Sequence, residues 1–307
     1  MRADAGRQEA GERLDVFLAG PLGSRTRAQA AISAGLVKVN GRPAPKRHRL
    51  EEGDVVEWTE PPEREDPEAE EGGPAVAAPR IAWEDEHLLV VDKPAGMATH
   101  PSRGHQTGTL SQALAGFASG GHDPERAGIV HRLDLDTSGL LVVARDDSTH
   151  RALQEAIARR EVRREYLALV AGRPKSRAGT IDAPIGRDRG HRTVQSVDTD
   201  NPRDAVTHFE IEEELPQATL LRVSLETGRT HQIRAHLQAI GLPIAGDPDY
   251  GVEGALGLER QFLHAARLAF EHPEGGAIDV ASPLPDDLAT ALERARAGEE
   301  VREPGRS

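Results

Sequence analysis

The chain has 307 residues, a formal net charge of −13 and no cysteine, and its mass of 33.1 kDa suits two domains of ordinary size. The missing cysteines exclude disulfides, thiolate metal sites and cysteine nucleophiles, and the scarcity of aromatic residues predicts a core of aliphatic side chains. The N-terminus lacks the apolar segment of a signal peptide, and no apolar run approaches the roughly 20 residues that cross a bilayer. These features favour a soluble and cytoplasmic protein, and we expect it to be a monomer.

Charge is distributed unevenly along the chain. Residues 13–49 carry eight basic residues and one acid, whereas residues 59–73 carry seven acids and one base. The acidic stretch also contains prolines and glycines, which interrupt hydrogen-bonded structure, so it is typical of a solvated linker, with a charged surface loop as the alternative. We therefore expect a basic module at 12–58, a linker at 59–78, a larger domain at 79–290 and a frayed charged tail at 291–307.

The basic module has the pattern of two short helices followed by strands. Helices are predicted at 13–18 and from the N-cap Ser24 to Gly35. A strand at 36–39 meets Asn40-Gly41, a strong tight-turn signal, and another strand is predicted at 55–58. The basic residues of this module predict a surface that faces phosphates: Arg25, Arg27, Lys38, Arg42, Lys46 and Arg47.

Four segments of this module carry a family resemblance: Arg13-Leu-Asp15, Ser24-Arg-Thr-Arg27, Gly35-Leu-Val-Lys-Val-Asn-Gly41 and Gly53-Asp54. They resemble the S-four-type RNA-binding module that a small-subunit ribosomal protein shares with tyrosyl-tRNA synthetases and several RNA-modifying enzymes. An ordinary basic αβ appendage is the alternative interpretation.

The rest of the chain contains many strand patterns and few helices. Strands are predicted at 81–83, 87–92, 129–134, 140–144, 166–170, 206–211 and 220–225, and helices at 109–117 and 147–160. Thr137-Ser138-Gly139 is predicted to form a turn between two of the strands. Because strands and helices do not alternate regularly, we expect an α+β domain with a mixed, largely antiparallel sheet.

The first polar constellation is His131-Arg132-Leu133-Asp134-Leu135-Asp136-Thr137-Ser138-Gly139. A turn between apolar strands is a rigid place to mount a reactive carboxylate such as Asp134, although an Asx-turn with solvent-facing charges is the simpler alternative. A metal site at Asp134 and Asp136 would need more carboxylates nearby. A serine hydrolase at Ser138 would need a glycine two residues earlier, and the chain lacks a phosphate-binding Gly-Lys-Ser/Thr motif.

The second polar constellation runs from Glu226 to Leu237 and opens a helix that we expect to end at Gly241. Helical periodicity places Arg234 on a polar stripe with His231, opposite an apolar stripe. His231 and His236 are five residues apart, which does not suit a zinc-binding helix, and His236 is more typical of a packed core histidine.

Together these segments resemble the RluA-type RNA pseudouridine synthases. The resemblance is carried, in the family's order, by Val91-Asp-Lys-Pro-Ala-Gly96, Thr99-His-Pro101, His131-Arg-Leu-Asp134, Thr137-Ser-Gly-Leu-Leu-Val-Val-Ala144, Arg164-Glu-Tyr166, Gly228-Arg-Thr-His-Gln-Ile-Arg-Ala-His236 and Gly246-Asp-Pro-Asp-Tyr-Gly251. Ser102 stands where a glycine is common, which is a minor departure at a turn.

The resemblance implies a pseudouridine synthase fold and assigns catalytic roles to Asp134, Tyr166 and Arg234. Asp134 would act as nucleophile or base, Arg234 would keep it ionised, and Tyr166 would stack on an extruded uracil and transfer a proton. Arg132 would fill the gap that the flipped base leaves or contact the RNA backbone. Further RNA contacts are expected from His131, Arg229 and His231.

The function that we expect is isomerisation of uridines in RNA, most simply large-subunit ribosomal RNA, without a cofactor, metal or nucleotide. Three alternatives stay open at this point: a catalytically inactive RNA-binding or ribosome-assembly factor, a synthase that acts on transfer or messenger RNA, and a metal-dependent phosphoesterase. The sequence does not name the target uridine, because RNA recognition depends on shape and loop contacts.

Overall fold

The structure is a computed structural model of the chain, and it describes residues 1–7, 9–22, 28, 31–32, 34–59, 79–102, 105–121, 128–191 and 194–301. The chain divides into two compact units, Met1–Ala75 and Val76–Ser307. The predicted linker at 59–78 lies, apart from its first residue, outside the described residues. Each unit is described by itself below.

The first unit contains a four-stranded sheet in the order β1-β4-β2-β3. Its elements are β1 (Arg2–Asp4), α1 (Leu14–Phe17), β2 (Val37–Val39), β3 (Arg42–Pro43) and β4 (Val55–Trp58). The hairpin between β2 and β3 turns at Asn40 and Gly41, whose φ angles of 51° and 76° confirm the tight turn that the sequence predicts. Most of the predicted helix from Ser24 to Gly35 lies outside the described residues.

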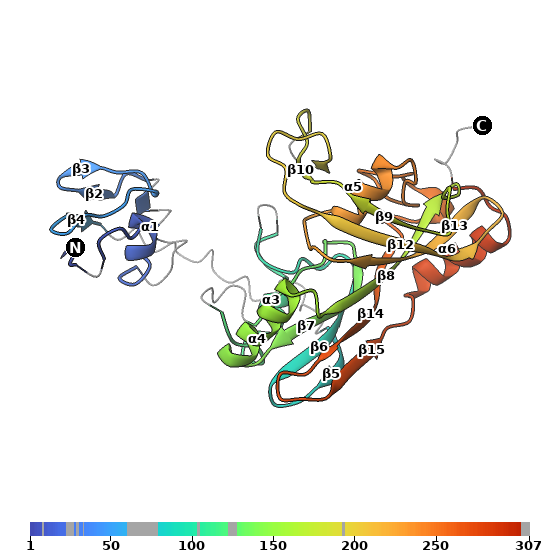
Figure 1. Cartoon of the computed structure of the whole chain (residues 1–307), viewed down its shortest axis with the longest axis horizontal. Helices are drawn as coiled ribbons and strands as arrows, with labels where there is room; N and C mark the ends of the chain where they lie inside the picture. Colours follow the sequence, from blue (N-terminus) through green and yellow to red (C-terminus); the bar gives the residue numbers. More distant parts are fainter. Residues whose placement is uncertain are drawn as a thin grey trace. The chain divides into compact units, whose positions relative to one another are not determined.

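The second unit is organised around a nine-stranded sheet (Figure 1). Its strands in spatial order are β5 (Arg80–Glu84), β6 (Leu88–Lys93), β7 (Ser138–Ala144), β14 (Leu263–Glu271), β8 (Arg163–Ala171), β13 (Ala218–Leu225), β12 (Val206–Glu214) and β9 (Ala178–Asp182), with β15 (Ala277–Ala281) paired to β14. The β7–β14 pair is parallel and the other pairs are antiparallel. This arrangement confirms the predicted α+β class with a mixed, largely antiparallel sheet, preceded by a small αβ module.

Short helices and one small hairpin complete the second unit. They are α3 (Leu110–Ala113), α4 (Asp147–Ala158), α5 (Gln232–Ala239), the 3₁₀ helix η2 (Ala255–Gly257), α6 (Asp286–Arg296) and the pair β10 (Gly186–Arg187) and β11 (Gln195–Ser196). Asp146 caps α4 by accepting a hydrogen bond from the backbone of Thr149, which explains why the helix begins there. α4 packs beside β7, whereas α6 lies near β12, where Arg296 pairs with Glu213 (Figure 1). No described helix has the length and apolar character that crossing a bilayer requires.

Both faces of the sheet are covered where β6 and β7 run. Leu89 and Val91 of β6 belong to one buried cluster, and the alternating Leu88 and Val90 belong to another. Gly139 of β7 permits the close approach of β14, because a Cβ at this position would lie 2.3 Å from the carbonyl oxygen of Ala265.

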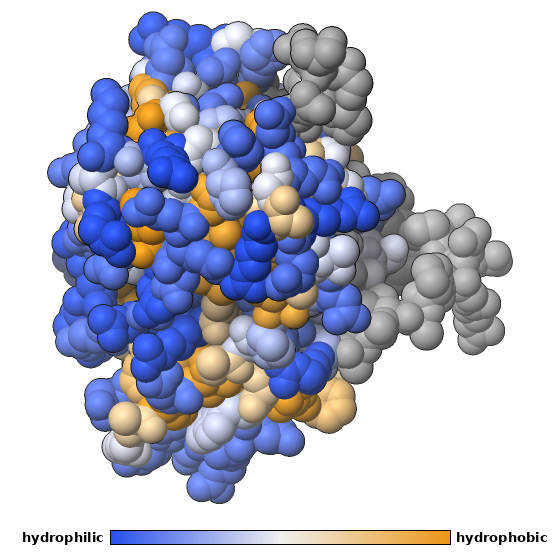
Figure 2. Space-filling model, turned by 90° about the vertical axis from the view of Figure 1, so that its right-hand side faces the viewer, coloured by the Kyte–Doolittle hydropathy of each residue, from blue (hydrophilic) through white to orange (hydrophobic). Residues whose placement is uncertain are grey.

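The face drawn in Figure 2 is largely hydrophilic, with hydrophobic residues in separate patches. Most apolar side chains of the strands β6 and β7 are buried in the clusters that cover the sheet.

Three expectations about local structure were wrong. Residues 130–134 form no strand, since Ile129 makes a single bridge to Val143 and an irregular loop follows. The turn lies at residues 135–136, and Ser138 and Gly139 already belong to β7. The C-terminal tail also begins later than expected, because residues 291–296 form the end of α6, where Ala291, Leu292 and Ala295 are buried.

Candidate active site

A cavity of about 610 Å³ opens in the second unit. It is lined by the loop that precedes β7, by parts of α4 and β8, and by the start of α5 with the loop before it. Among the described lining residues, Asp134 is the single acid, against three arginines: Arg132, Arg164 and Arg229. The cavity therefore suits an anionic ligand although the whole chain is acidic.

The loop that carries Asp134 is fixed by side chains from distant parts of the sequence. Three of them donate hydrogen bonds to its backbone carbonyls: Lys93 to Leu135 (3.0 Å), Thr99 to Leu133 (2.8 Å) and Arg260 to Asp136 (2.9 Å). Gln261 adds a hydrogen bond to the hydroxyl of Thr137 (3.2 Å). The loop is irregular yet rigidly held, which is what a catalytic carboxylate needs.

Lys93 was not singled out in the sequence, although it lies in the Val91–Gly96 motif. Its side chain is fully buried, and its ammonium group donates to three backbone carbonyls, those of Pro94, Met97 and Leu135. Burial lowers the pKa of Lys93 to about 7, while the negative charges of Asp134 and Asp136 act in the opposite direction. A buried amine thus holds the loop of Asp134 through the carbonyl of Leu135.

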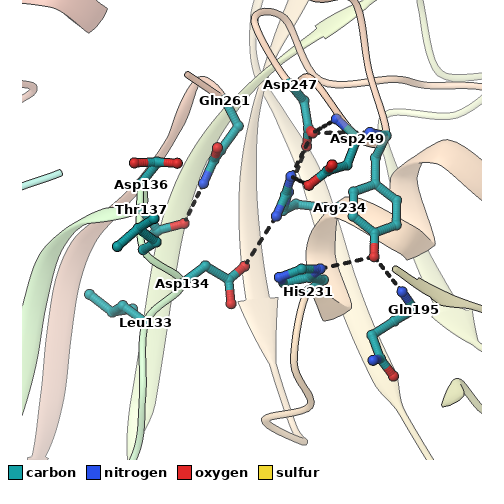
Figure 3. Close-up of polar contacts among 12 residues, drawn as sticks. Leu133, Asp134, Asp136, Thr137, Gln195, His231, Arg234, Asp247, Asp249 and Gln261 are labelled. Atoms are coloured by element: carbon teal, nitrogen blue, oxygen red, sulfur yellow. Dashed lines mark hydrogen bonds and ion pairs between the residues drawn. The ribbon is translucent and has the colours of Figure 1, made fainter. Parts of the chain in front are cut away.

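Arg234 lies on α5 and faces the interior, with 5% of its side chain exposed. The helical pattern predicted a polar face, but the partners of this arginine come from the protein itself. Its guanidinium donates two hydrogen bonds of 2.7 Å to Asp247 and one of 2.9 Å to Asp249, and its Nη1 lies 4.0 Å from a carboxylate oxygen of Asp134 (Figure 3). Burial alone would lower the pKa of Arg234, but the hydrogen bonds and charges of these carboxylates raise it above its ordinary value.

Tyr250 connects Arg234 to other parts of the site. The guanidinium carbon of Arg234 lies 4.7 Å from the centre of the Tyr250 ring, in cation–π geometry. The Tyr250 hydroxyl accepts a hydrogen bond from the backbone N–H of Gln195 and lies 2.9 Å from Nδ1 of His231. Burial lowers the pKa of His231, so the hydroxyl is placed to donate to a neutral imidazole. Asp247, Asp249 and Tyr250 were visible in the sequence as the Gly246–Gly251 motif, but their contacts with Arg234 were not.

Tyr166 projects from β8 into the same cavity as Asp134. The side chain is buried, and within the described part of the chain its hydroxyl makes no hydrogen bond. Burial raises the pKa of Tyr166, so the phenol is neutral at physiological pH. A neutral hydroxyl without a protein partner is available to a ligand.

The predicted RNA contacts divide into two groups. Arg132, His131, Arg229 and His231 all line the cavity. Arg132 is exposed and makes no ion pair within the described residues, and Nε of Arg229 donates to the carbonyl of Asp204. One nitrogen of His131, by contrast, accepts a hydrogen bond from the backbone of Val142, and burial lowers the pKa of His131 to about 3, so this ring is neutral.

The other predicted contacts belong to the first unit. Lys38, Arg42, Lys46 and Arg47 are exposed and have no ion-pair partner among the described residues. Arg25 and Arg27 lie outside the described residues.

Comparison with known proteins agrees with this geometry. The family model described as RNA pseudouridylate synthase matches residues 87–239, and the model described as S4 domain matches residues 12–56. The chain is 42% identical to a protein named uncharacterized RNA pseudouridine synthase YlyB of Bacillus subtilis, over 95% of this chain and 97% of that protein. It is 43% identical to ribosomal large subunit pseudouridine synthase D of Nitrosomonas europaea, over 94% of this chain and 85% of that protein.

A solved structure shows the same fold. Human RNA pseudouridylate synthase domain containing 1 superimposes with a TM-score of 0.56 and 26% sequence identity, covering 70% of this chain and 86% of that one. The fold, the cavity and these similarities define an RNA-modifying isomerase. The chain belongs to the RNA pseudouridine synthase family and carries an S4 RNA-binding domain at its N-terminus.

Proposed function

We propose that this synthase converts specific uridines of large-subunit ribosomal RNA to pseudouridine, with Asp134 as the catalytic carboxylate. The substrate class is supported by relatives that are named ribosomal large subunit pseudouridine synthase D, including those of Nitrosomonas europaea and Xanthomonas campestris. Such a substrate implies action in the cytoplasm, where bacterial ribosomes are assembled.

The observation that carries the proposal is the setting of Asp134. Its side chain is 14% exposed and lines the cavity, and within the described residues its carboxylate makes no hydrogen bond. The guanidinium of Arg234 places a positive charge 4.0 Å from this carboxylate and leaves its oxygens free of hydrogen bonds. An ionised carboxylate that is held rigidly and left free for a ligand is suited to act as nucleophile or base.

The reaction itself is an isomerisation. The bond between N1 of uracil and C1′ of ribose breaks, the base rotates, C5 bonds to C1′, and the hydrogen lost from C5 is balanced by one gained at N1. Atoms and electrons therefore balance without an oxidant, a reductant or a nucleotide. We propose that the residues of the cavity suffice for this chemistry, with no cofactor.

Tyr166 and Arg132 act beside Asp134 in this proposal. The ring of Tyr166 forms a flat buried wall on which the extruded uracil can stack, and its free neutral hydroxyl can pass a proton. Arg132 is exposed at the cavity and can replace the flipped base in the RNA stack or pair with phosphate. Lys38, Arg42, Lys46 and Arg47 of the S4 domain would bind the RNA backbone.

Pseudouridine mapping in cells with and without the protein tests this proposal. We expect one or a few sites in large-subunit ribosomal RNA to lose pseudouridine, and expression of the wild-type chain, but not of Asp134→Asn, to restore them. Lost sites confined to transfer RNA would contradict the substrate class. Restoration by Asp134→Asn would contradict the catalytic assignment.

A further inference from the structure

We propose that the cavity has a second arm along α4 that binds an unpaired RNA base next to the target uridine. The inference rests on the proposed function, because it names a further subsite for the same RNA. The arm, called the α4 arm below, consists of His150, Gln154 and Ile157, all of which line the cavity. Their spacing of four and three residues places them on one face of the helix.

The cavity is lined by residues that precede β7, such as Asp134 and Thr137, and by α4, which follows β7. Asp134 lies just before the first residue of this strand, Ser138, and the backbone N–H of Thr137 bonds to its carbonyl. α4 begins at Asp147, just after the strand ends at Ala144. A seven-residue strand spans roughly 20 Å, so Asp134 and the start of α4 lie near opposite ends of it. A uracil ring at Asp134 is far too short to reach the start of α4.

His150 lies at the Ala144 end of the cavity. Backbone hydrogen bonds join Ala144 to Ser119 (3.2 Å) and to Gly128 (2.8 Å), and Gly128 to Gly120 (2.9 Å). The next residue, Gly121, packs against the His150 ring: a Cβ on it would lie 2.9 Å from Cε1, and its φ of +93° favours glycine. The imidazole is therefore held between α4 and this glycine backbone.

The polar groups of the α4 arm lack protein partners. His150 is 6% exposed, and its imidazole makes no hydrogen bond within the described part of the chain. A polar group without a protein partner is available to bond to a ligand or to water. Gln154 is exposed, and its side-chain amide likewise has no described partner. The amide offers a donor and an acceptor side by side, which is the pattern that reads the edge of a base.

RNA supplies the ligand that fits this arm. Synthases of this kind act on a base removed from its stack, and unpaired neighbours can be splayed out with it. The three arginines of the cavity would hold the phosphates, while Ile157 offers an apolar contact for the face of the base. The arm would thus read the identity of a flanking nucleotide, while Asp134 acts on the uridine.

The test uses the full-length enzyme and RNA fragments that carry the mapped target uridine, with each flanking position changed in turn to all four bases. Single-turnover rates at subsaturating enzyme give kcat/KM for each fragment. We expect wild type to prefer one base at one flanking position by about ten-fold or more, and Gln154→Ala to reduce that preference several-fold. His150→Phe, which keeps a ring against Gly121, should reduce the same preference. Glu155→Ala, on α4 but outside the cavity lining, should leave it unchanged.

The outcomes separate this inference from the proposed function. If wild type forms pseudouridine but ignores both flanking bases, or if Gln154→Ala and His150→Phe keep the full preference, the α4 arm is not a base subsite. If wild type forms no pseudouridine on any fragment of ribosomal RNA, the proposed function itself has failed.

Discussion

The guanidinium of Arg234 lies 4.0 Å from the carboxylate of Asp134, yet its shortest hydrogen bonds, both of 2.7 Å, go to Asp247. Asp247 is fully buried and also accepts the backbone N–H groups of Asp249 and Tyr250, at 3.0 Å each. The position of Arg234 is therefore set by Asp247 rather than by Asp134. This arrangement leaves the oxygens of Asp134 free for substrate while keeping a positive charge beside them.

Loss of the Asp247 charge is expected to destabilise the second unit strongly. Asp247→Asn leaves a buried guanidinium without its main counter-charge, which costs about 3–5 kcal/mol in comparable cases. Asp249→Asn is the matched control, because this carboxylate is 47% exposed and makes one hydrogen bond, so about 1 kcal/mol or less is expected.

Urea unfolding followed by tryptophan fluorescence measures this difference. The chain has two tryptophans, Trp58 in the first unit and Trp83 in the second, so a Trp58→Phe background reports the second unit alone. Equal free energies of unfolding for the two variants would show that Asp247 does not anchor Arg234.

Removal of the Tyr166 hydroxyl should separate stacking from proton transfer. Tyr166→Phe keeps the buried ring, so RNA affinity should change little, whereas loss of a proton-transferring group lowers turnover by about 10²–10⁴-fold. Tyr166→Leu should lose affinity for the flipped base as well. Single-turnover rates and RNA binding measured on the same fragment distinguish the two effects. A Tyr166→Phe enzyme with wild-type rates would assign the residue to stacking alone.

Lys93 is expected to make stability depend on pH. Its pKa falls from 10.5 in the unfolded chain to about 7 in the folded protein, because the amine is buried. Between these values the unfolded state binds more protons, so the free energy of unfolding should rise with pH above about 7, by up to about 1.4 kcal/mol per pH unit. Below pH 7 both states are protonated and the dependence vanishes.

Lys93→Met is the control for this pH dependence, because it keeps the buried chain but removes the titrating group. Urea unfolding between pH 7 and 9 should show a smaller rise for the variant than for the wild type. Parallel rises in the two proteins would mean that the amine stays protonated when folded, held by its three carbonyl acceptors.

Neutralising the exposed bases of the S4 domain should weaken RNA binding in a salt-dependent way. A variant with Lys38, Arg42, Lys46 and Arg47 all changed to alanine removes four exposed charges without touching the core. If each contacts a phosphate, the slope of log affinity against log salt should become shallower by up to about 3. Turnover at saturating enzyme should persist, because the cavity belongs to the second unit. An unchanged slope of log affinity against log salt would show that the RNA backbone does not contact these four residues.

Much of the fold could be predicted because its signals are local. The Asn40-Gly41 turn, the apolar strands and the capped helix α4 follow from turn chemistry, period-two patterning and the Asp146 N-cap. The strand predicted at 129–134 does not form, although apolar residues within it are buried as in a strand. These residues lie in an irregular loop, and the backbone carbonyls of the loop accept hydrogen bonds from Lys93, Thr99 and Arg260 rather than from a neighbouring strand. Local patterning carries no information about such distant donors.

The site shows the same division. Asp134, Tyr166 and Arg234 could be selected from motifs, but helical periodicity placed Arg234 on a polar face, whereas in the structure it is buried. Arg234 can be buried because the fold brings Asp247 and Asp249, from a later loop, within hydrogen-bond distance of its guanidinium. The buried amine of Lys93 and the α4 arm likewise arise from contacts between segments that are far apart in the sequence.

The rate of pseudouridine formation by Asp134→Asn, measured under single-turnover conditions on a ribosomal RNA fragment, tests the central claim most directly. Asp134 lines the cavity beside Arg234, so loss of its charge should reduce turnover to background while RNA affinity stays near that of the wild type. Asp136→Asn is the matched control two residues along the same loop, where the backbone carbonyl rather than the side chain makes the contact with Arg260, and it should retain most of the activity. Wild-type turnover by Asp134→Asn would contradict both the choice of site and its chemistry.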